Sequence, residues 1–335
     1  IMDMPNTNPL TVTLDALNAK LDLLNEKCIV NHSCYFGATN NNYTEFDKLD
    51  KHRVCGIKLF MGSSTGNMLV DKMNSLLNIF NGTDMLIAAH CEDQETIKNN
   101  IEKYKQKYKG ADDIPVSAHP SIRSVPACYA SSELAVRLAK IAGARLHILH
   151  VSTAKELQLF SDVPLANKNI TAEACVAHLL FTLTHYNSLG ARIKCNPAVK
   201  RKTDREALRT AVNSGLIDVI ATDHAPHLLS EKEGGALKAM SGMPMIQFSL
   251  VSMLELVDEG VFSLETVVQK MCHAPARIYG ICQRGYIREG YQADLVLVRP
   301  NSPWEVTTDK ILSKCGWSPL EGHTFNWKVE KTFAN

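Results

Sequence analysis

Short apolar runs alternate with longer amphipathic segments along most of the chain. The runs occupy 1–4, 28–37, 54–62, 85–93, 145–152, 170–175 and 218–226. Between them, segments such as 70–80 and 131–143 repeat apolar residues at intervals of three and four, which predicts amphipathic helices. Seven strands that alternate with helices indicate a parallel sheet covered by helices on both faces, either doubly wound or closed as a barrel.

The pattern changes near the C-terminal end of the chain. From residue 283 onwards the runs become β-type and are punctuated by glycine, and no long helical repeat follows. At about 150 residues per domain, 335 residues suggest two domains unless the first is an α/β barrel. We therefore expect an α/β unit over 1–282 and a small β appendage over 283–335.

Charge and cysteine content limit the kinds of molecule that we expect the protein to bind and the compartment in which we expect it. The 36 Lys and Arg residues balance 35 Asp and Glu, so we expect no nucleic-acid surface and no anionic-membrane surface. Ten cysteines form no CxxC pair, which is typical of reduced thiols in a cytoplasmic protein. No apolar run reaches the roughly 18 residues of a membrane span. A small-molecule substrate in the cytoplasm is the resulting expectation.

Polar residues stand where the predicted strands end. They are Lys58, His90, His147, His150, Glu173, Asp223 and His227. Taken singly, each has an ordinary structural interpretation, as a hydrogen-bonded core residue, a snorkelling lysine or a helix cap. In a parallel barrel, however, the carboxyl ends of all strands converge on one face, where active sites lie. Their recurrence at successive strand ends favours a shared site.

The residue types at these strand ends suit a metal centre. His90, His150 and Asp223 offer the nitrogen and oxygen donors that zinc and similar divalent ions bind. Burial beside positive charge lowers the pKa of a lysine, and the neutral amine of Lys58 can then react with carbon dioxide to form a carbamate. A carbamate has two anionic oxygens and can bridge two metal ions about 3.5–4 Å apart.

Six motifs stand in order along the chain: MPNTNP, GIKLFMGSSTGNM, AAHCED, HILHVSTA, KCNPAVKRKTDREAL and ATDHAPH. Together they resemble the dihydroorotases of the amidohydrolase superfamily, and they span nearly the whole sequence. The resemblance implies a TIM-type (β/α)8 barrel with two divalent metal ions, zinc being the expected metal. It implies a carboxylated Lys58 that bridges them, with His90, His150 and Asp223 as further ligands.

The same resemblance implies the reaction and the substrate contacts. Asp223 would also carry the proton, and Asn6, Asn196 and His227 would bind the substrate. The reaction would be reversible interconversion of N-carbamoyl-L-aspartate and L-dihydroorotate in pyrimidine biosynthesis, by a two-metal hydroxide mechanism. An imidazole at His227 suits the extra carboxylate of dihydroorotate. The resemblance also implies that the protein forms a homodimer.

One family feature is missing from the chain. Counted from Asp223 on strand eight, Lys58 falls on strand four and residues 1–4 on strand two. The first-strand HxH pair of the family, and the Arg after it, have no counterpart, because no HxH occurs in the 335 residues. We therefore expect a barrel without its first strand and a chain that is nearly inactive by itself.

Several alternatives stay open from the sequence. A hydantoinase- or allantoinase-like cyclic amidohydrolase would share the metal ligands, and a non-catalytic dihydroorotase-like subunit would lack HxH. GSSTG at 62–66 matches a GxSxG nucleophile elbow with Ser64 as the attacking residue, although that leaves Lys58 and His90 without a role. His147 and Glu173 are either supporting residues or additional metal contacts.

Overall fold

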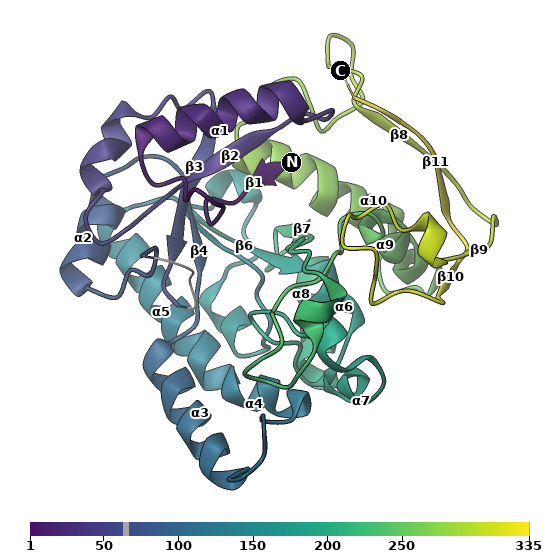
Figure 1. The fold of residues 1–335 in the computed structure, drawn as a ribbon. Coiled ribbons are helices and arrows are strands. Elements are labelled where there is room, and N and C mark those ends of the chain that lie inside the picture. Colours follow the sequence, from purple (N-terminus) through teal and green to yellow (C-terminus); the bar gives the residue numbers. More distant parts are fainter. Residues whose placement is uncertain (63–66, 335) are drawn as a thin grey trace.

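The computed structural model describes residues 1–62 and 67–334. Its centre is a seven-stranded parallel sheet in which each strand pairs with the next along the chain (Figure 1). The strands are β1 (Met2–Asp3), β2 (Ser33–Gly37), β3 (Val54–Phe60), β4 (Ile87–His90), β5 (Leu146–Ile148), β6 (Ile170–Cys175) and β7 (Val219–Ala221). The predicted seven strands and their parallel order are confirmed.

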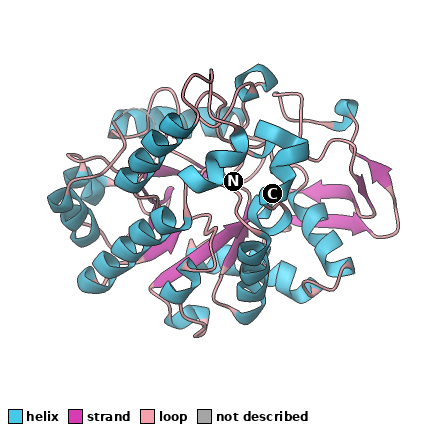
Figure 2. Ribbon diagram, turned by 90° about the horizontal axis from the view of Figure 1, so that it is seen from below, coloured by secondary structure: helices cyan, strands magenta, loops and turns pink. Residues whose placement is uncertain are grey.

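Helices surround this sheet, as the view in Figure 2 shows. They are α1 (Leu14–Lys27), α2 (Met73–Asn81), α3 (Gln94–Lys107), α4 (His119–Ile122), α5 (Val125–Ala142), α6 (Val176–Leu180), α7 (Tyr186–Leu189), α8 (Lys202–Ser214), α9 (Ser249–Asp258), α10 (Leu264–Val268) and α11 (Ala274–Ile278). In the described part of the chain, no helix combines the length and apolarity needed to cross a membrane.

The two helices predicted from periodicity are present as α2 and α5, with shifted bounds. The helix α5 starts six residues earlier than the predicted segment 131–143, because Pro126 lies in its first turn, where a missing N–H costs no hydrogen bond. Its C-terminal end follows the usual rule, since Gly143 adopts the left-handed conformation with φ 67°.

The strands are buried on both faces. In β4 and β5 every residue is buried, and β3 is buried at six of its seven positions. Ile57, Leu59 and Ile87 are completely enclosed and belong to the main apolar core. Burial on both faces explains why these strands read as continuous apolar runs in the sequence rather than as alternating ones.

A second apolar layer fills the concave side of the sheet. Tyr35, Ala88 and Leu149 contact one another there, with Tyr279, just after α11, packed against them. The phenol oxygens of Tyr35 and Tyr279 lie 2.7 Å apart, and their rings meet edge to face. This layer forms a floor beneath the carboxyl ends of the strands.

All of the strands except β6 are shorter than the predicted runs, and two of them end early for a local reason. The run 145–152 is a strand only to Ile148, and the run 218–226 only to Ala221. The reason is local backbone geometry: His150 and Asp223 have φ values of 40° and 43°, which an extended strand does not allow. Both residues lie on turns just past the strand ends.

The C-terminal part of the chain is built from short antiparallel strands. β8 (Leu295–Arg299) pairs with β11 (Lys328–Phe333), and β9 (Trp304–Glu305) pairs with β10 (Thr324–Phe325). Phe325 and Val306 pack on Phe248 at the start of α9. The part with β9 and β10 therefore rests on the barrel helices, while the domain boundary at residue 282 stays a prediction.

The sheet curls without closing in the part of the chain that the structure describes. There, β1 pairs with β2 alone and β7 with β6 alone, so each leaves one edge without a neighbouring strand. Both edges carry unpaired backbone groups on that side. The half-barrel that results presents its concave face along β3, β4, β5 and β6.

Candidate active site

Four predicted site residues lie at the carboxyl ends of the parallel strands. Lys58 is inside β3, and His90 is the last residue of β4. His150 and Asp223 each follow a strand end by two residues. Because side chains alternate between faces and Lys58 pairs with Ala88 in the ladder, Lys58 and His90 point to the same concave face.

His90 and His150 form the closest pair in this group. Nδ1 of His90 lies 3.0 Å from Nε2 of His150, and the rings meet at 72°. Burial lowers the pKa of both imidazoles, that of His150 strongly, and the positive charge of Lys58 adds to the effect. The two rings therefore share a hydrogen bond in which one facing nitrogen carries the hydrogen, and the other nitrogen has a lone pair that a metal could bind.

Lys58 is a buried lysine, with only 2% of its surface exposed. Its ammonium lies 4.4 Å from the centre of the Phe60 ring. Burial lowers its pKa to about 8, against the opposing influence of the carboxylates of Asp223 and Glu173. More of this amine is thus neutral near pH 7 than in an exposed lysine, and carbamate formation requires the neutral form.

Asp223 is open to solvent, yet protein atoms crowd around its carboxyl group. This crowding raises its pKa to about 6, while Lys58 works in the opposite direction and Glu173 in the same one. Lys58 and Asp223 therefore each shift the pKa of the other. The positive φ angles of His150 and Asp223 are strained backbone conformations of the kind that accumulates at functional sites.

Buried acidic residues support the two histidines. Nε2 of His90 lies 2.9 Å from Oε2 of Glu92, and Arg123 pairs with that same oxygen. Although burial favours the neutral acid, Arg123 and His90 lower the pKa of Glu92 to about 2. Glu92 lies inside the AAHCED motif, but the sequence pattern assigned it no role, and no local signal linked Arg123 to it.

Glu173 supports the second histidine. The backbone N–H of His150 donates to Oε1 of Glu173 at 3.2 Å, and Oε2 of Glu173 lies 3.2 Å from Nε2 of His147. Nδ1 of His147 lies 2.8 Å from the Thr171 hydroxyl. His147 pairs with Ala88 in the ladder and so points to the same concave face as Lys58, with its two ring nitrogens engaged by Thr171 and Glu173.

Two of the expected substrate contacts lie on loops at the same end of the sheet. Asn6 is exposed on the loop after β1. Asn196 is partly buried and follows Cys195, whose pKa rises to about 12 through burial and, next, the nearby charge of Asp223. The Asn196 loop therefore borders the site, whereas Asn6 is placed there only by its position after β1.

His227 lies four residues after Asp223, on the same loop. Its Nε2 is 3.2 Å from the carbonyl oxygen of Ser241, and its Nδ1 is 3.7 Å from a carboxylate oxygen of Glu231. Its own carbonyl oxygen accepts a hydrogen bond from the buried Trp317 indole at 2.7 Å. His227 is thus held by its loop and does not contact the His90–His150 pair.

Comparison with known proteins decides the family. Residues 70–333 match the amidohydrolase family. The chain belongs to that family. A dihydroorotase of Halobacterium salinarum is 31% identical over 325 residues, covering 96% of this chain and 74% of that protein. An allantoinase of Bacillus velezensis is 29% identical over 340 residues, covering 99% and 73%.

A solved relative places the fold within the same amidohydrolase family. The L-hydantoinase from Arthrobacter aurescens superimposes with a TM-score of 0.91 at 27% identity, over all of this chain and 77% of its own. A dihydropyrimidinase from Brevibacillus agri aligns with a TM-score of 0.87 at 20% identity. The predicted barrel fold and the predicted amidohydrolase class are confirmed.

Amidohydrolases typically use two metal ions, and the donor set of this chain can be tested against them. Within residues 1–62 and 67–334, no three His, Cys, Asp or Glu side chains stand together as a metal site. The His90–His150 pair nevertheless offers two converging nitrogens, and Nδ1 of His150 is buried without a hydrogen-bond partner among the described residues. With Lys58 and Asp223 at the same end of the sheet, these residues fit part of a metal centre.

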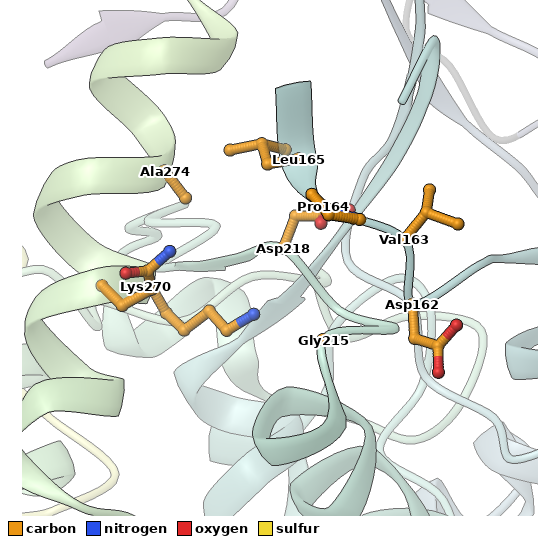
Figure 3. A pocket seen from close by; sticks show the side chains of 9 residues that line it. Asp162, Val163, Pro164, Leu165, Gly215, Asp218, Lys270 and Ala274 are labelled. Atoms are coloured by element: carbon orange, nitrogen blue, oxygen red, sulfur yellow. The ribbon is translucent and has the colours of Figure 1, made fainter. Parts of the chain in front are cut away.

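Two other candidate sites offer weaker support for a catalytic function. Ser64, the alternative nucleophile, lies outside the described residues. A cavity of about 180 Å³, whose lining is drawn in Figure 3, opens at the start of β7, at the opposite end of that strand from Asp223. Its lining includes Asp218 and Lys270, but Asp218 is paired with Lys168 at 2.8 Å and Lys270 donates to a backbone carbonyl at 2.6 Å. These charges are used in holding the fold.

Proposed function

We propose that the protein is a dihydroorotase, which interconverts L-dihydroorotate and N-carbamoyl-L-aspartate. The observation that supports the proposal is that Lys58, Asp223 and the hydrogen-bonded His90–His150 pair all lie at the carboxyl ends of the parallel strands. This is the ligand set expected from the resemblance to dihydroorotases. The 31% identical dihydroorotase of Halobacterium salinarum supports this substrate.

In this proposal the metal centre would be held by His90, His150, Asp223 and a carboxylated Lys58, with zinc as the metal. When bound, the two ions polarise the amide carbonyl and make water acidic enough to attack at neutral pH. The lowered pKa of Lys58 favours its carboxylation, because only the unprotonated amine attacks carbon dioxide. Cytoplasmic location and the homodimer stay predictions.

Asp223 is the proton carrier of the proposed reaction. Its carboxylate oxygen takes the proton from the attacking water and delivers it to the ring nitrogen as the C–N bond breaks. Its position on a turn just after β7 supports this role, since the residue is exposed at the carboxyl end of that strand. Ring closure follows the same path in reverse.

His227 is the proposed determinant of the substrate. Dihydroorotate carries a carboxylate that neutral cyclic ureides lack, and an imidazole can hold it. The Nδ1 of His227 lies 3.7 Å from a carboxylate oxygen of Glu231 on the same loop. Asn6 and Asn196, on loops at the same end of the sheet, are the proposed contacts to the rest of the ring.

Turnover of three substrates tests the proposal. A zinc-loaded preparation, which includes any residues the gene encodes beyond this chain, is compared on L-dihydroorotate, hydantoin and allantoin. We expect dihydroorotate to be preferred, and His227→Ala to raise its KM roughly 10- to 100-fold, the effect of losing one charged contact. A preference for allantoin or hydantoin, unchanged in His227→Ala, would contradict the assignment.

One observation favours a second candidate, a hydantoinase- or allantoinase-type enzyme. Both ring nitrogens of His227 already face protein oxygens, so the imidazole does not lie free for a substrate carboxylate. The L-hydantoinase of Arthrobacter aurescens also superimposes over the whole chain. The three-substrate comparison separates these candidates, and a non-catalytic subunit would turn over none of the three.

A further inference from the structure

We propose that Glu92 and Arg123 form a positioning pair that keeps the ring hydrogen of His90 on Nε2 and so presents Nδ1 to the metal. The metal-binding part of this inference rests on the proposed function. The placement of the hydrogen does not, because it concerns the chain without metal. Neither residue would touch the substrate, and both would act through His90.

The first support is the geometry at Glu92. Its Oε2 lies 2.9 Å from Nε2 of His90, and the Arg123 guanidinium pairs with the same oxygen. The side chain of Glu92 is fully buried and that of Arg123 is 13% exposed. A carboxylate paired with arginine accepts hydrogen bonds and donates none, so Nε2 of His90 must carry the hydrogen.

The second support is what this leaves on the other side of the ring. With the hydrogen on Nε2, the neutral His90 ring presents a lone pair at Nδ1. That atom lies 3.0 Å from Nε2 of His150, on the concave face. The nitrogen offered to a metal is therefore the one that faces the second histidine, while the other nitrogen is tied to the protein.

The third support is that Arg123 is itself fixed. Nδ2 of Asn100 in α3 donates to the carbonyl oxygen of Ile122 at 2.9 Å and to the hydroxyl of Ser124 at 3.3 Å. The residues on both sides of Arg123 are thus anchored to a long helix. Orientation of the His90 ring depends on α3 through Arg123 and Glu92, a chain of contacts that a metal-binding histidine commonly requires.

A double substitution separates positioning from mere structural support. Glu92→Met/Arg123→Met removes both buried charges and keeps similar volumes, a change that proteins often tolerate without loss of stability. Zn²⁺ affinity is measured by competition with a chromophoric chelator, and long-range ¹H–¹⁵N spectra report which nitrogen of His90 carries the hydrogen in metal-free protein. We expect roughly 10- to 100-fold weaker Zn²⁺ binding and loss of the single Nε2–H form.

Glu156→Gln is the matched control. Glu156 is equally buried and accepts hydrogen bonds from Ser132 and Thr153, but it contacts neither histidine. We expect this control to keep wild-type Zn²⁺ affinity and the Nε2–H form of His90. The Arg123→Lys variant retains the positive charge and should recover part of the affinity that the double variant loses.

The outcomes distinguish this inference from the proposed function. If wild-type protein binds no Zn²⁺, the proposed metal enzyme fails, and the spectra still decide where the hydrogen lies. If wild type binds Zn²⁺ and the folded double variant binds it equally well, the positioning pair is refuted while the metal enzyme stands. A wild-type His90 with its hydrogen on Nδ1 would also refute the pair.

Discussion

At the scale of single residues, Lys58 is the group whose position is hardest to explain by packing. An ammonium group enclosed by protein loses its hydration, and among the described residues Lys58 gains in return the Phe60 ring face and the charges of the Asp223 and Glu173 carboxylates. This imbalance lowers its pKa to about 8. A side chain needed for stability alone would be an apolar one at this position.

Replacing Lys58 by Met tests this argument. Met has similar length and no charge to desolvate, so we expect thermal unfolding to occur at the same temperature or higher. Catalytic turnover and bound zinc should both fall, turnover by more than about 100-fold, because the proposed bridging ligand is gone. A variant that keeps both its zinc and its rate would refute the role of Lys58.

The sequence predicts some site residues and not others, for a physical reason. Lys58, His90, His150 and Asp223 each stand near the end of an apolar run, and parallel strands bring such ends together. Arg123 stands in a loop, and its partner Glu92 is 31 residues away. A contact between a loop and a strand end depends on how α3 and the following segment pack, which local pattern does not encode.

At the scale of elements, the segment 224–243 after β7 is held by a buried lysine. Nζ of Lys232 donates to the backbone carbonyls of Lys194, Met240 and Gly242, at 3.1, 2.6 and 2.8 Å. These bonds tie the segment that carries His227 to the one that carries Asn196. The two proposed substrate-binding segments are thereby fixed to each other.

Lys232→Met should loosen this connection. It removes three hydrogen bonds, although the Lys194 carbonyl keeps the one it accepts from the Gly242 N–H, so we expect a loss of about 3 kcal/mol in the free energy of unfolding. Lys238→Met is the matched control on the same segment. The Lys238–Asp112 ion pair is exposed, so its loss should cost less than about 0.5 kcal/mol. Urea unfolding of both variants measures the difference, and equal losses would contradict the buried clamp.

An ion pair between His323 and Glu255 makes the packing of the C-terminal strands on α9 depend on pH. Nε2 of His323, beside β10, lies 2.8 Å from Glu255 of α9, and this hydrogen bond raises the pKa of His323. A histidine whose pKa is raised by folding adds stability below its unfolded pKa of about 6.5. The contribution is lost as the pH rises through the folded pKa.

Substituting this histidine should therefore matter only in acid. We expect His323→Gln to lower the free energy of unfolding by less than about 1 kcal/mol near pH 5, because the pair is partly exposed, and by nothing near pH 8.5. Glu255→Gln should behave in the same way. Urea unfolding at the two pH values measures both variants, and a loss that is equal at both would show that charge plays no part.

At the scale of the whole molecule, the sequence predicts the alternation of strands and helices but not the residues at which they end. Strand number and parallel order follow from buried apolar runs separated by helical repeats. The ends of β5 and β7 differ from prediction because His150 and Asp223 turn the chain into positive φ. Such turns belong to the site at the strand ends. The apolar run continues past the strand, so the sequence pattern does not predict where the turn begins.

The incomplete sheet leads to a prediction for the 335-residue chain by itself. Its described residues bring together two imidazoles, a lysine and an aspartate, but no three His, Cys, Asp or Glu side chains in metal-binding geometry, and its sequence has no HxH pair. Zinc affinity grows with the number of ligands that the fold holds in place, four in most closed sites. Equilibrium dialysis should therefore find fewer than two tightly bound zinc ions per chain, and zinc addition should produce little dihydroorotate turnover. Two tightly bound ions with full turnover would mean that the half-barrel closes by itself into a complete site, and that first-strand ligands are not needed to complete it.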